Sequence, residues 1–468
     1  MTPTAVAEDV QVPALIVPGD RGRLLDLPAM TLVRGRHTAV VGPSGAGKSL
    51  FLHALFGWLK DGPDAVLSPR DGGYLMIQDP GGGLTPALSV AGHFRELGLG
   101  RDWRARVTAV MARLDLDAVL LSRLPEQLSG GQRQRVMLAL ILCRRPRWVV
   151  CDEPAASLDR DAERAMVALL KAEADHFGFT LVFVTHQGRL VREMADQVLM
   201  IDRGKAAFFG GVAAFFEAPA RGVHADLVAA WQARDAVSPP PVSSDEPRLL
   251  HGRVALGYGD VWLVRDWPLH LTPGRLHWLA APSGAGKTTL AKLLAGFPEP
   301  ARWAGELALA EKPLAADWRL RSVEHRYAVA WLFQHGHAAF NPHTPMAQQW
   351  KRLIAGCADR QARPLAELAQ AFERWREILG LGSLDFARSP ATFSIGERQR
   401  CQLLRALLLQ PRLLIADELL SALDVLTRRV LLDLLRRFAE ERQAAVLLFS
   451  HNPDWDTTRD RRLLWPAG

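Results

Sequence analysis

The sequence lacks the features of a membrane-spanning, secreted or disulfide-stabilised protein. No run approaches the roughly 18 consecutive apolar residues that a membrane helix needs. The start of the chain holds Glu8 and Asp9 and has no basic segment followed by an apolar core, so we expect no signal peptide. The few cysteines show no CxxC spacing, which favours buried free thiols in a reducing compartment; they are Cys143, Cys151, Cys357 and Cys401.

Charge is also not concentrated in any one segment. The chain has 57 Lys and Arg against 50 Asp and Glu, a net charge of +7. Because this excess is spread along the chain, it argues against a nucleic-acid footprint and suits phosphate ligands or acidic lipid headgroups. With 49% hydrophobic residues among 468, the chain has enough apolar material for two or three globular domains.

The most informative feature is an internal repeat. PSGAGK occurs at 43–48 and again at 282–287. The later motifs SGGQRQR, VVCDEP, SLD and VTH are each answered 265 residues further on by SIGERQR, LIADEL, ALD and FSH. A constant offset across four motifs predicts a duplicated domain. The Pro- and Ser-rich segment 235–248 reads as a linker, so we predict a first domain over 1–234 and a second over 249–468.

Each copy carries a phosphate-binding loop. The segment GPSGAGKS lies between an apolar strand and a helical run, which is the context that such a loop requires. Glycines let backbone N–H groups point at phosphate, the helix supplies its positive end, and the lysine neutralises charge. In the second copy an alanine replaces the first glycine, and we expect nucleotide binding to survive this loss of backbone freedom. The predicted phosphate-contacting residues are Gly42, Pro43, Ser44, Gly45, Ala46, Gly47, Lys48 and Ser49, with Ala281, Pro282, Ser283, Gly284, Ala285, Gly286, Lys287 and Thr288.

Two carboxylates end a buried strand in each copy, at Asp152–Glu153 and Asp417–Glu418. This position places them at the carboxyl edge of a sheet, beside the phosphate loop. The aspartates suit a Mg²⁺ shell together with Ser49 and Thr288, and the glutamates suit a general base that polarises the attacking water. His186 and His451 also end apolar strands. A lone histidine is more often structural, but the repeated position favours contact with the γ-phosphate and the attacking water.

The motif order, with LSGGQ at Leu128–Gln132, resembles that of the nucleotide-binding subunits of ABC (ATP-binding cassette) transporters. The resemblance covers nearly the whole chain outside the linker and termini. It implies an α/β fold with two tandem P-loop NTPase domains. Each would have a mainly parallel sheet core and a helical signature subdomain, and the two would form a head-to-tail pseudo-dimer. It also implies an ATPase that uses ATP and Mg²⁺, with Gln78 and Gln334 completing the metal shells.

The same resemblance implies two unlike ATP sites, because in this family the signature of one domain faces the phosphates held by the other. The first loop would meet Phe393–Glu397, where Ile395 replaces a glycine and Glu397 adds negative charge. The second loop would meet the intact signature. Tyr258 is placed to stack on adenine at the second site, whereas Gly19 occupies the matching position of the first copy. We therefore expect faster turnover at the second site. The signature residues are Ser129, Gly130, Gly131 and Gln132 in the first copy, and Ser394 and Gly396 in the second.

Two further segments resemble the oligopeptide, dipeptide and nickel importer subfamily. These are QDPGGGLTP (78–86) with its counterpart QHGHAAFNP (334–342), and the tail 213–231, which resembles that subfamily's C-terminal extension. The resemblance implies two integral-membrane permease subunits, a solute-binding protein and no nucleic-acid partner. It places the chain peripherally at the cytoplasmic face of the inner membrane. Peptide, nickel and metal chelate all stay open as cargo. Three histidines lie in or directly after the second segment, His335, His337 and His343. Metal binding is the less favoured interpretation of them, because no Cys or acid lies at ligand spacing.

Two other classes share this motif order. Soluble tandem ABC proteins that act on ribosomes or nucleic acid typically have a long, charged, helical linker, whereas this linker is short, Pro-rich and nearly uncharged. A half of an exporter would normally be fused to membrane helices, which are not present in this sequence. The sequence therefore favours the importer ATPase and keeps the soluble tandem ATPase as the alternative.

Overall fold

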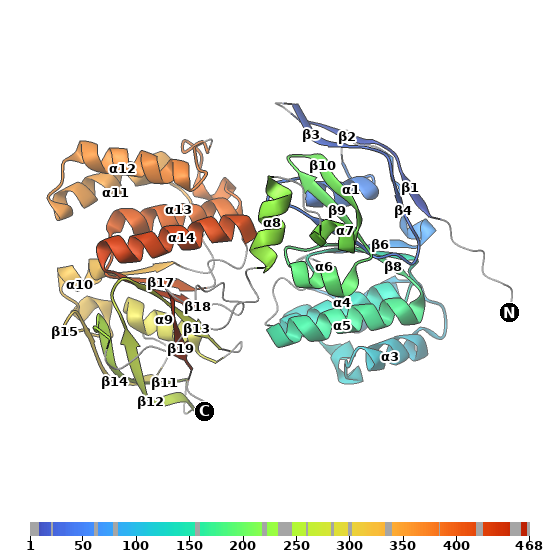
Figure 1. The fold of residues 1–468 in the computed structure, drawn as a ribbon. Helices are drawn as coiled ribbons and strands as arrows, with labels where there is room; N and C mark the ends of the chain where they lie inside the picture. Colours follow the sequence, from blue (N-terminus) through green and yellow to red (C-terminus); the bar gives the residue numbers. More distant parts are fainter. Residues whose placement is uncertain are drawn as a thin grey trace. The chain divides into compact units, whose positions relative to one another are not determined.

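The computed structural model describes residues 9–19, 22–59, 64–77, 83–154, 160–217, 222–232, 246–258, 261–281, 285–297, 302–332, 339–382, 384–417, 425–449 and 460–465. Its main division falls between Ala233 and Arg234 and separates two compact units, drawn in Figure 1. Of the predicted linker, only 246–248 belongs to the described residues.

The first unit is built on a mixed sheet whose centre is parallel. Among the described residues the order is β2-β3-β10-β9-β5-β8-β7-β6, and the five strands from β9 to β6 run parallel. A separate antiparallel pair joins β1 (Val10–Val12) to β4 (Met30–Leu32). The sheet strands are β2 (Leu15–Gly19), β3 (Gly22–Leu27), β5 (Thr38–Val41), β6 (Gly73–Met76), β7 (Trp148–Asp152), β8 (Thr180–Val184), β9 (Gln197–Asp202) and β10 (Lys205–Gly211).

Alternate side chains of these strands enter two separate cores, one on each face of the sheet. Ala39 and Val41 of β5 join the larger cluster, whereas Val40 joins the cluster that contains helix α1. Strands with both faces buried are mostly apolar, as β5 is after its first residue, Thr38. The helices of the unit are α1 (Lys48–Leu55), α2 (Val90–Glu96), α3 (Trp103–Arg113), α4 (Gly130–Leu142), α5 (Arg160–Phe177), α6 (Gly188–Met194), α7 (Val212–Glu217) and α8 (Val223–Gln232).

The second unit repeats the parallel core strand for strand. Its order β16-β17-β18-β13-β19 corresponds to β6-β7-β8-β5-β9, and all its neighbouring strands are parallel. A second, antiparallel sheet has the order β12-β11-β14-β15 among the residues described. The strands are β11 (Leu250–Tyr258), β12 (Val261–Leu271), β13 (Arg275–Ala280), β14 (Arg302–Leu309), β15 (Lys312–Pro313), β16 (Val329–Leu332), β17 (Leu413–Asp417), β18 (Ala445–Phe449) and β19 (Asp460–Leu464).

Each unit adds a group of packed helices on one side of its parallel core. In the first unit α2, α3 and α4 contact one another, and in the second α11, α12 and α13 do the same. Figure 1 shows α12, α13 and α14 in successive layers over the strands of the second unit. The predicted α/β fold with two parallel cores and helical signature subdomains is confirmed. The helices are α9 (Lys287–Ala295), α10 (Val323–Ala328), α11 (Met346–Gln361), α12 (Leu365–Ile378), α13 (Ile395–Leu409) and α14 (Val425–Arg442).

Two expectations from composition can be compared with these elements. All four cysteines are buried and free, as predicted. Burial raises the pKa of the Cys151 thiol to about 12, so this group stays protonated and unreactive at neutral pH. None of the described helices combines the length and the apolar character needed to cross a membrane.

A buried ion pair ties α14 to the parallel sheet of the second unit. Asp460, at the first position of β19, is fully buried and accepts hydrogen bonds from Arg436 Nε (3.0 Å) and Nη2 (2.9 Å). It also accepts one from Trp278 Nε1 of β13 at 2.8 Å. Arg436 makes a further ion pair with Asp433 (3.1 Å), whose side chain is half exposed. Removing one member of a buried pair leaves the other charge uncompensated.

We predict that Asp460→Asn destabilises the second unit by about 3–5 kcal/mol, because the Arg436 guanidinium then lacks its buried counter-charge. The matched control, Asp433→Asn, removes the half-exposed partner of the same arginine and should cost less than about 1 kcal/mol. Urea unfolding of the full chain, followed by tryptophan fluorescence, measures both. Equal shifts for the two variants would contradict this assignment.

Candidate functional site

The first phosphate loop joins the carboxyl end of β5 to α1 through glycines in left-handed conformations. Gly42, Gly45 and Gly47 have φ values of 144°, 74° and 106°. At Gly42 a β-carbon would lie 2.0 Å from the carbonyl oxygen of Ile201 on the neighbouring strand β9. The loop therefore begins where the sheet leaves no room for a side chain.

Lys48, the first residue of α1, is buried and lies across this loop. Its Nζ donates to the carbonyl oxygens of Gly42 (2.9 Å) and Pro43 (2.8 Å). Gly47 precedes the helix and provides no side-chain cap for its first N–H groups. A buried ammonium and the amino end of a helix thus meet at the loop, where both favour an anion.

Asp152, the last residue of β7, contacts the helix that follows this loop. Asp152 accepts a hydrogen bond from Ser49, the second residue of α1. Burial raises the pKa of Asp152 above its ordinary value, and the hydrogen bond from Ser49 opposes this rise. The Ser49 hydroxyl and the Asp152 carboxylate therefore lie together next to the phosphate loop. Mg²⁺ prefers oxygen ligands of this kind.

Glu153 and His186 form a hydrogen-bonded pair. His186 Nε2 lies 2.7 Å from Glu153 Oε1, and each side chain is only about a fifth exposed. Glu153 has a φ of 50°, a left-handed conformation that costs a non-glycine residue about 1–2 kcal/mol. Such strain is characteristic of functional positions, where the surrounding fold holds it in place.

The signature segments begin the helices α4 and α13. Ser129 Oγ accepts the Gln132 N–H, and Gln132 Oε1 accepts the Ser129 N–H, which forms a capping box. A β-carbon on Gly130 or Gly131 would meet nothing within 4 Å, so the backbone at this helix end faces open space.

The second signature forms the same cap with a charged residue. Glu397 Oε2 accepts the Ser394 N–H at 2.7 Å, and Ser394 Oγ accepts the Glu397 N–H at 3.2 Å. The Glu397 carboxylate therefore turns back onto the helix end, where its negative charge competes with an anionic ligand. Gly396 leaves open space as the first-copy glycines do.

The second phosphate loop repeats the first in its described part. Lys287 is buried and donates to the carbonyl of Ala281 at 2.7 Å, and Gly286 has a φ of 105°. Ala281 is itself buried, so this loop begins with a side chain where the first has none. Thr288 follows the lysine on α9, and Ala285 is partly buried. Residues Pro282, Ser283 and Gly284 lie outside the described residues.

Other predicted site residues stay predictions. Asp417 ends β17, but its side chain is not described, and four residues lie outside the described ranges: Gln78, Gln334, Glu418 and His451. Tyr258 ends β11 with 54% of its surface exposed, which leaves its ring accessible to a base. His335 and His337 are outside the described part, within which no group of three metal-binding side chains is found.

Two features near these sites gave no signal in the sequence motifs. The tail helix α8 reaches the loop after β8, where Trp231 Nε1 donates to the His186 carbonyl at 2.9 Å. In the second unit, buried Arg321 donates to the carbonyls of Ala315 (2.7 Å) and Leu293 (3.2 Å), the latter in the last turn of α9. The sequence shows only that Trp231 is aromatic and that Arg321 is cationic, and neither fact predicts which carbonyl groups they contact.

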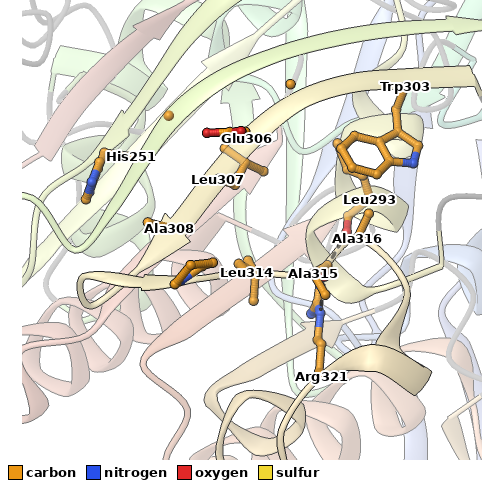
Figure 2. Close-up of a pocket in the computed structure, with 13 residues that line it drawn as sticks. His251, Leu293, Trp303, Glu306, Leu307, Ala308, Leu314, Ala315, Ala316 and Arg321 are labelled. Atoms are coloured by element: carbon orange, nitrogen blue, oxygen red, sulfur yellow. Dashed lines mark hydrogen bonds between the residues drawn. The ribbon is translucent and has the colours of Figure 1, made fainter.

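Arg321 lines a cavity of about 530 Å³ between the antiparallel sheet and α9. Figure 2 shows Arg321 below Ala315, with His251 and Glu306 on the strands above. None of the residues lining this cavity belongs to a phosphate loop, an acid pair or a signature. The hydrogen bonds of Arg321 give it a structural role, because they satisfy a carbonyl in the last turn of the phosphate-loop helix.

Comparison with known proteins agrees with this geometry. The ABC transporter family profile matches residues 25–156 and 264–421. The chain therefore belongs to the ABC transporter family and is an ATP-binding ATPase of that class.

Two curated relatives are the glutathione import ATP-binding proteins GsiA of Salmonella typhimurium (strain LT2) and Escherichia coli (strain K12). Each is 28% identical over 91% of this chain and 78% of the relative. Two solved structures share the fold. The archaeal ribosome recycling factor aABCE1, in complex with the ribosomal stalk protein aP1, has a TM-score of 0.63 and 20% identity, over 94% of this chain and 84% of that one. An RNase-L Inhibitor has a TM-score of 0.62 and 19% identity, over 96% and 89%.

We predict that Gly42→Ala weakens nucleotide binding at the first loop by at least about tenfold, because the added β-carbon forces the loop away from Ile201. Calorimetric titration of this variant with ATP should then detect one class of binding site. The same titration of the unaltered chain should detect two. Ala281→Gly is the matched change in the second loop and should retain both classes. Unaltered titration of a folded Gly42→Ala variant would contradict the prediction.

Proposed function

We propose that the chain energises an ABC importer of small peptides from the cytoplasmic face of the inner membrane, bound to two permease subunits. The observation that carries this proposal is the alignment of 91% of the chain, both loops included, with the glutathione import ATP-binding proteins. Glutathione is a short peptide, which agrees with the QDP-type segments of the sequence. A solute-binding protein would deliver the cargo to the permeases.

In this proposal each phosphate loop holds one ATP molecule. Ser49, Asp152 and Gln78 would hold Mg²⁺ at the first loop, and Thr288, Asp417 and Gln334 at the second. When bound, the ion would neutralise negative charge on the β- and γ-phosphates while water attacks the γ-phosphate and ADP leaves. The contact of Ser49 with Asp152 supports this assignment.

The proposed chemistry assigns the remaining residues by position. Lys48 and Lys287 would neutralise the phosphates, and Glu153 and Glu418 would act as general bases that accept a proton from the attacking water. His186 and His451 would contact the γ-phosphate and this water. The hydrogen bond between Glu153 and His186 supports a joint role at the first site.

The two sites should differ in turnover. The first loop would face Glu397, whose carboxylate lies at its helix end, whereas the second would face neutral Gln132. Tyr258 offers its exposed ring to adenine at the second site. These differences favour the second site for rapid hydrolysis.

The second unit also offers a surface that suits a permease helix. Adjoining cavities of about 460 and 390 Å³ are lined by residues on both sides of the glutamine segment, including Leu332 before it and Phe340 after it. Phe297 and Tyr327 line the first cavity and are about half exposed. Arg405 lines both cavities and donates to the Ala339 carbonyl at 2.7 Å. Exposed aromatic rings beside arginines are typical of the centres of protein interfaces.

A soluble tandem ATPase acting on ribosomes is the second candidate, and the fold shared with aABCE1 is the observation that favours it. Affinity purification of the tagged chain from detergent-solubilised membranes of its own source, with mass spectrometry, separates the two. Two permeases in the eluate would support the importer. If a solute-binding protein is recovered with them, the ligand bound to it would identify the cargo. Ribosomal proteins without any membrane protein would overturn it.

We predict that Glu418→Gln lowers steady-state ATPase activity of the assembled complex at least about tenfold, because it removes the general base of the faster site. Glu153→Gln, the matched change in the first copy, should lower it less than about threefold. Equal losses in the two variants would contradict unequal sites.

We also predict that Tyr327→Glu reduces recovery of the permeases at least about fivefold, because a charge placed in the proposed contact must be desolvated. Ile378→Glu serves as the control, since both side chains are 46% exposed and Ile378 lines neither cavity. Equal recovery with both variants would place the permease contact elsewhere.

A further inference from the structure

The tail of the first unit returns to the loop that carries His186. Trp231, near the end of α8, is only 6% exposed and donates its indole N–H to the His186 carbonyl at 2.9 Å. This bond joins a residue of the tail to a residue 45 positions earlier in the chain. The tail is therefore packed against the loop after β8.

The indole ring is packed on two sides, against α6 and against the aromatic rings of the tail. A β-carbon at Gly188, the first residue of α6, would lie 2.6 Å from carbon atoms of the Trp231 ring. On the tail side, Phe215 and Phe216 lie 6.0 and 5.9 Å from Trp231 between ring centroids. The guanidinium of Arg192, on α6, lies 4.1 Å from the Phe216 ring. This aromatic cluster fixes the direction in which the indole N–H points.

The residues on either side of His186, Thr185 and Gln187, are also hydrogen-bonded. The Thr185 N–H donates to the Val40 carbonyl of β5 at 3.2 Å. The Gln187 side chain donates to Glu163 at 2.9 Å. His186 itself is bonded through its imidazole to Glu153 and through its carbonyl to Trp231. Of these two bonds, the one to Trp231 comes from outside the parallel core.

We propose that Trp231 is a positioning residue for the His186–Glu153 pair, and that the α7–α8 tail is thereby part of the first ATP site. This rests on the proposed function, in which that pair acts on the ATP of the first loop. Without the indole N–H, the His186 carbonyl loses its partner and the loop gains freedom. The imidazole is then held less well against Glu153 and the γ-phosphate, which slows hydrolysis more than it weakens ATP binding.

The test is steady-state ATP hydrolysis by the full chain in its complex, in a Glu418→Gln background that suppresses the second site. Trp231→Phe keeps an aromatic ring at the position and removes the N–H donor together with the second ring of the indole. We expect kcat to fall about threefold to tenfold, as for the loss of one neutral hydrogen bond, while KM for ATP changes less than about twofold. In a His186→Ala background the same substitution should have no further effect, because Trp231 acts through His186.

Trp103→Phe on α3 is the matched control, since it makes the same substitution in the first unit at a ring outside the tail and its aromatic cluster, and its kcat should stay within twofold of the parent. Gly188→Ala is a second variant that displaces the indole from the other side and should reproduce the loss of Trp231→Phe. Thermal unfolding of each variant verifies that it is folded. An unchanged kcat in folded Trp231→Phe, or an equal loss in the His186→Ala background, would overturn the proposal. Failure of Glu153→Gln to slow hydrolysis in the Glu418→Gln background would overturn the catalytic assignment itself.

Discussion

Two buried lysine ammonium groups set the local geometry on which the rest of this structure depends. Lys48 and Lys287 are each the first residue of a helix and are almost fully buried. A buried charge is costly unless it is hydrogen-bonded, and each ammonium donates to carbonyls at the start of its own loop. The backbone must curl to present these carbonyls, which is why glycines with positive φ precede both helices. The same curl aims backbone N–H groups at the position of a phosphate.

The sheet order places everything else around these loops. In each unit the loop-bearing strand lies between the strand that leads to the histidine and the last strand of the parallel core. Because parallel strands end at one edge, Asp152, Glu153 and His186 emerge at the same edge of the first sheet as the phosphate loop. The hydrogen bond between His186 and Glu153 is the visible result in the first unit.

The two units differ at the ends of their elements and agree in their strand order. The first loop begins at a glycine pressed against Ile201, whereas the second begins at buried Ala281. One signature helix is capped by a neutral glutamine and the other by a carboxylate. Such changes leave the strand order intact, since they lie in loops and at helix ends and not within the parallel strands. A shared fold does not decide function, and the solved structures that share this fold include an archaeal ribosome recycling factor.

The sequence by itself determined the duplication, the phosphate loops, the strand-end acids and histidines, and the ATPase family, because each depends on residue types at short, fixed spacings. It could also place Ser129 and Ser394 at helix starts, since a cap is a local interaction. Only the tertiary structure decided the contacts between residues far apart in the chain. The clash that requires Gly42, the buried pair of Arg436 with Asp460 and the bond from Trp231 to His186 are of this kind. No local pattern encodes them, because each exists only after separate strands and helices have packed together.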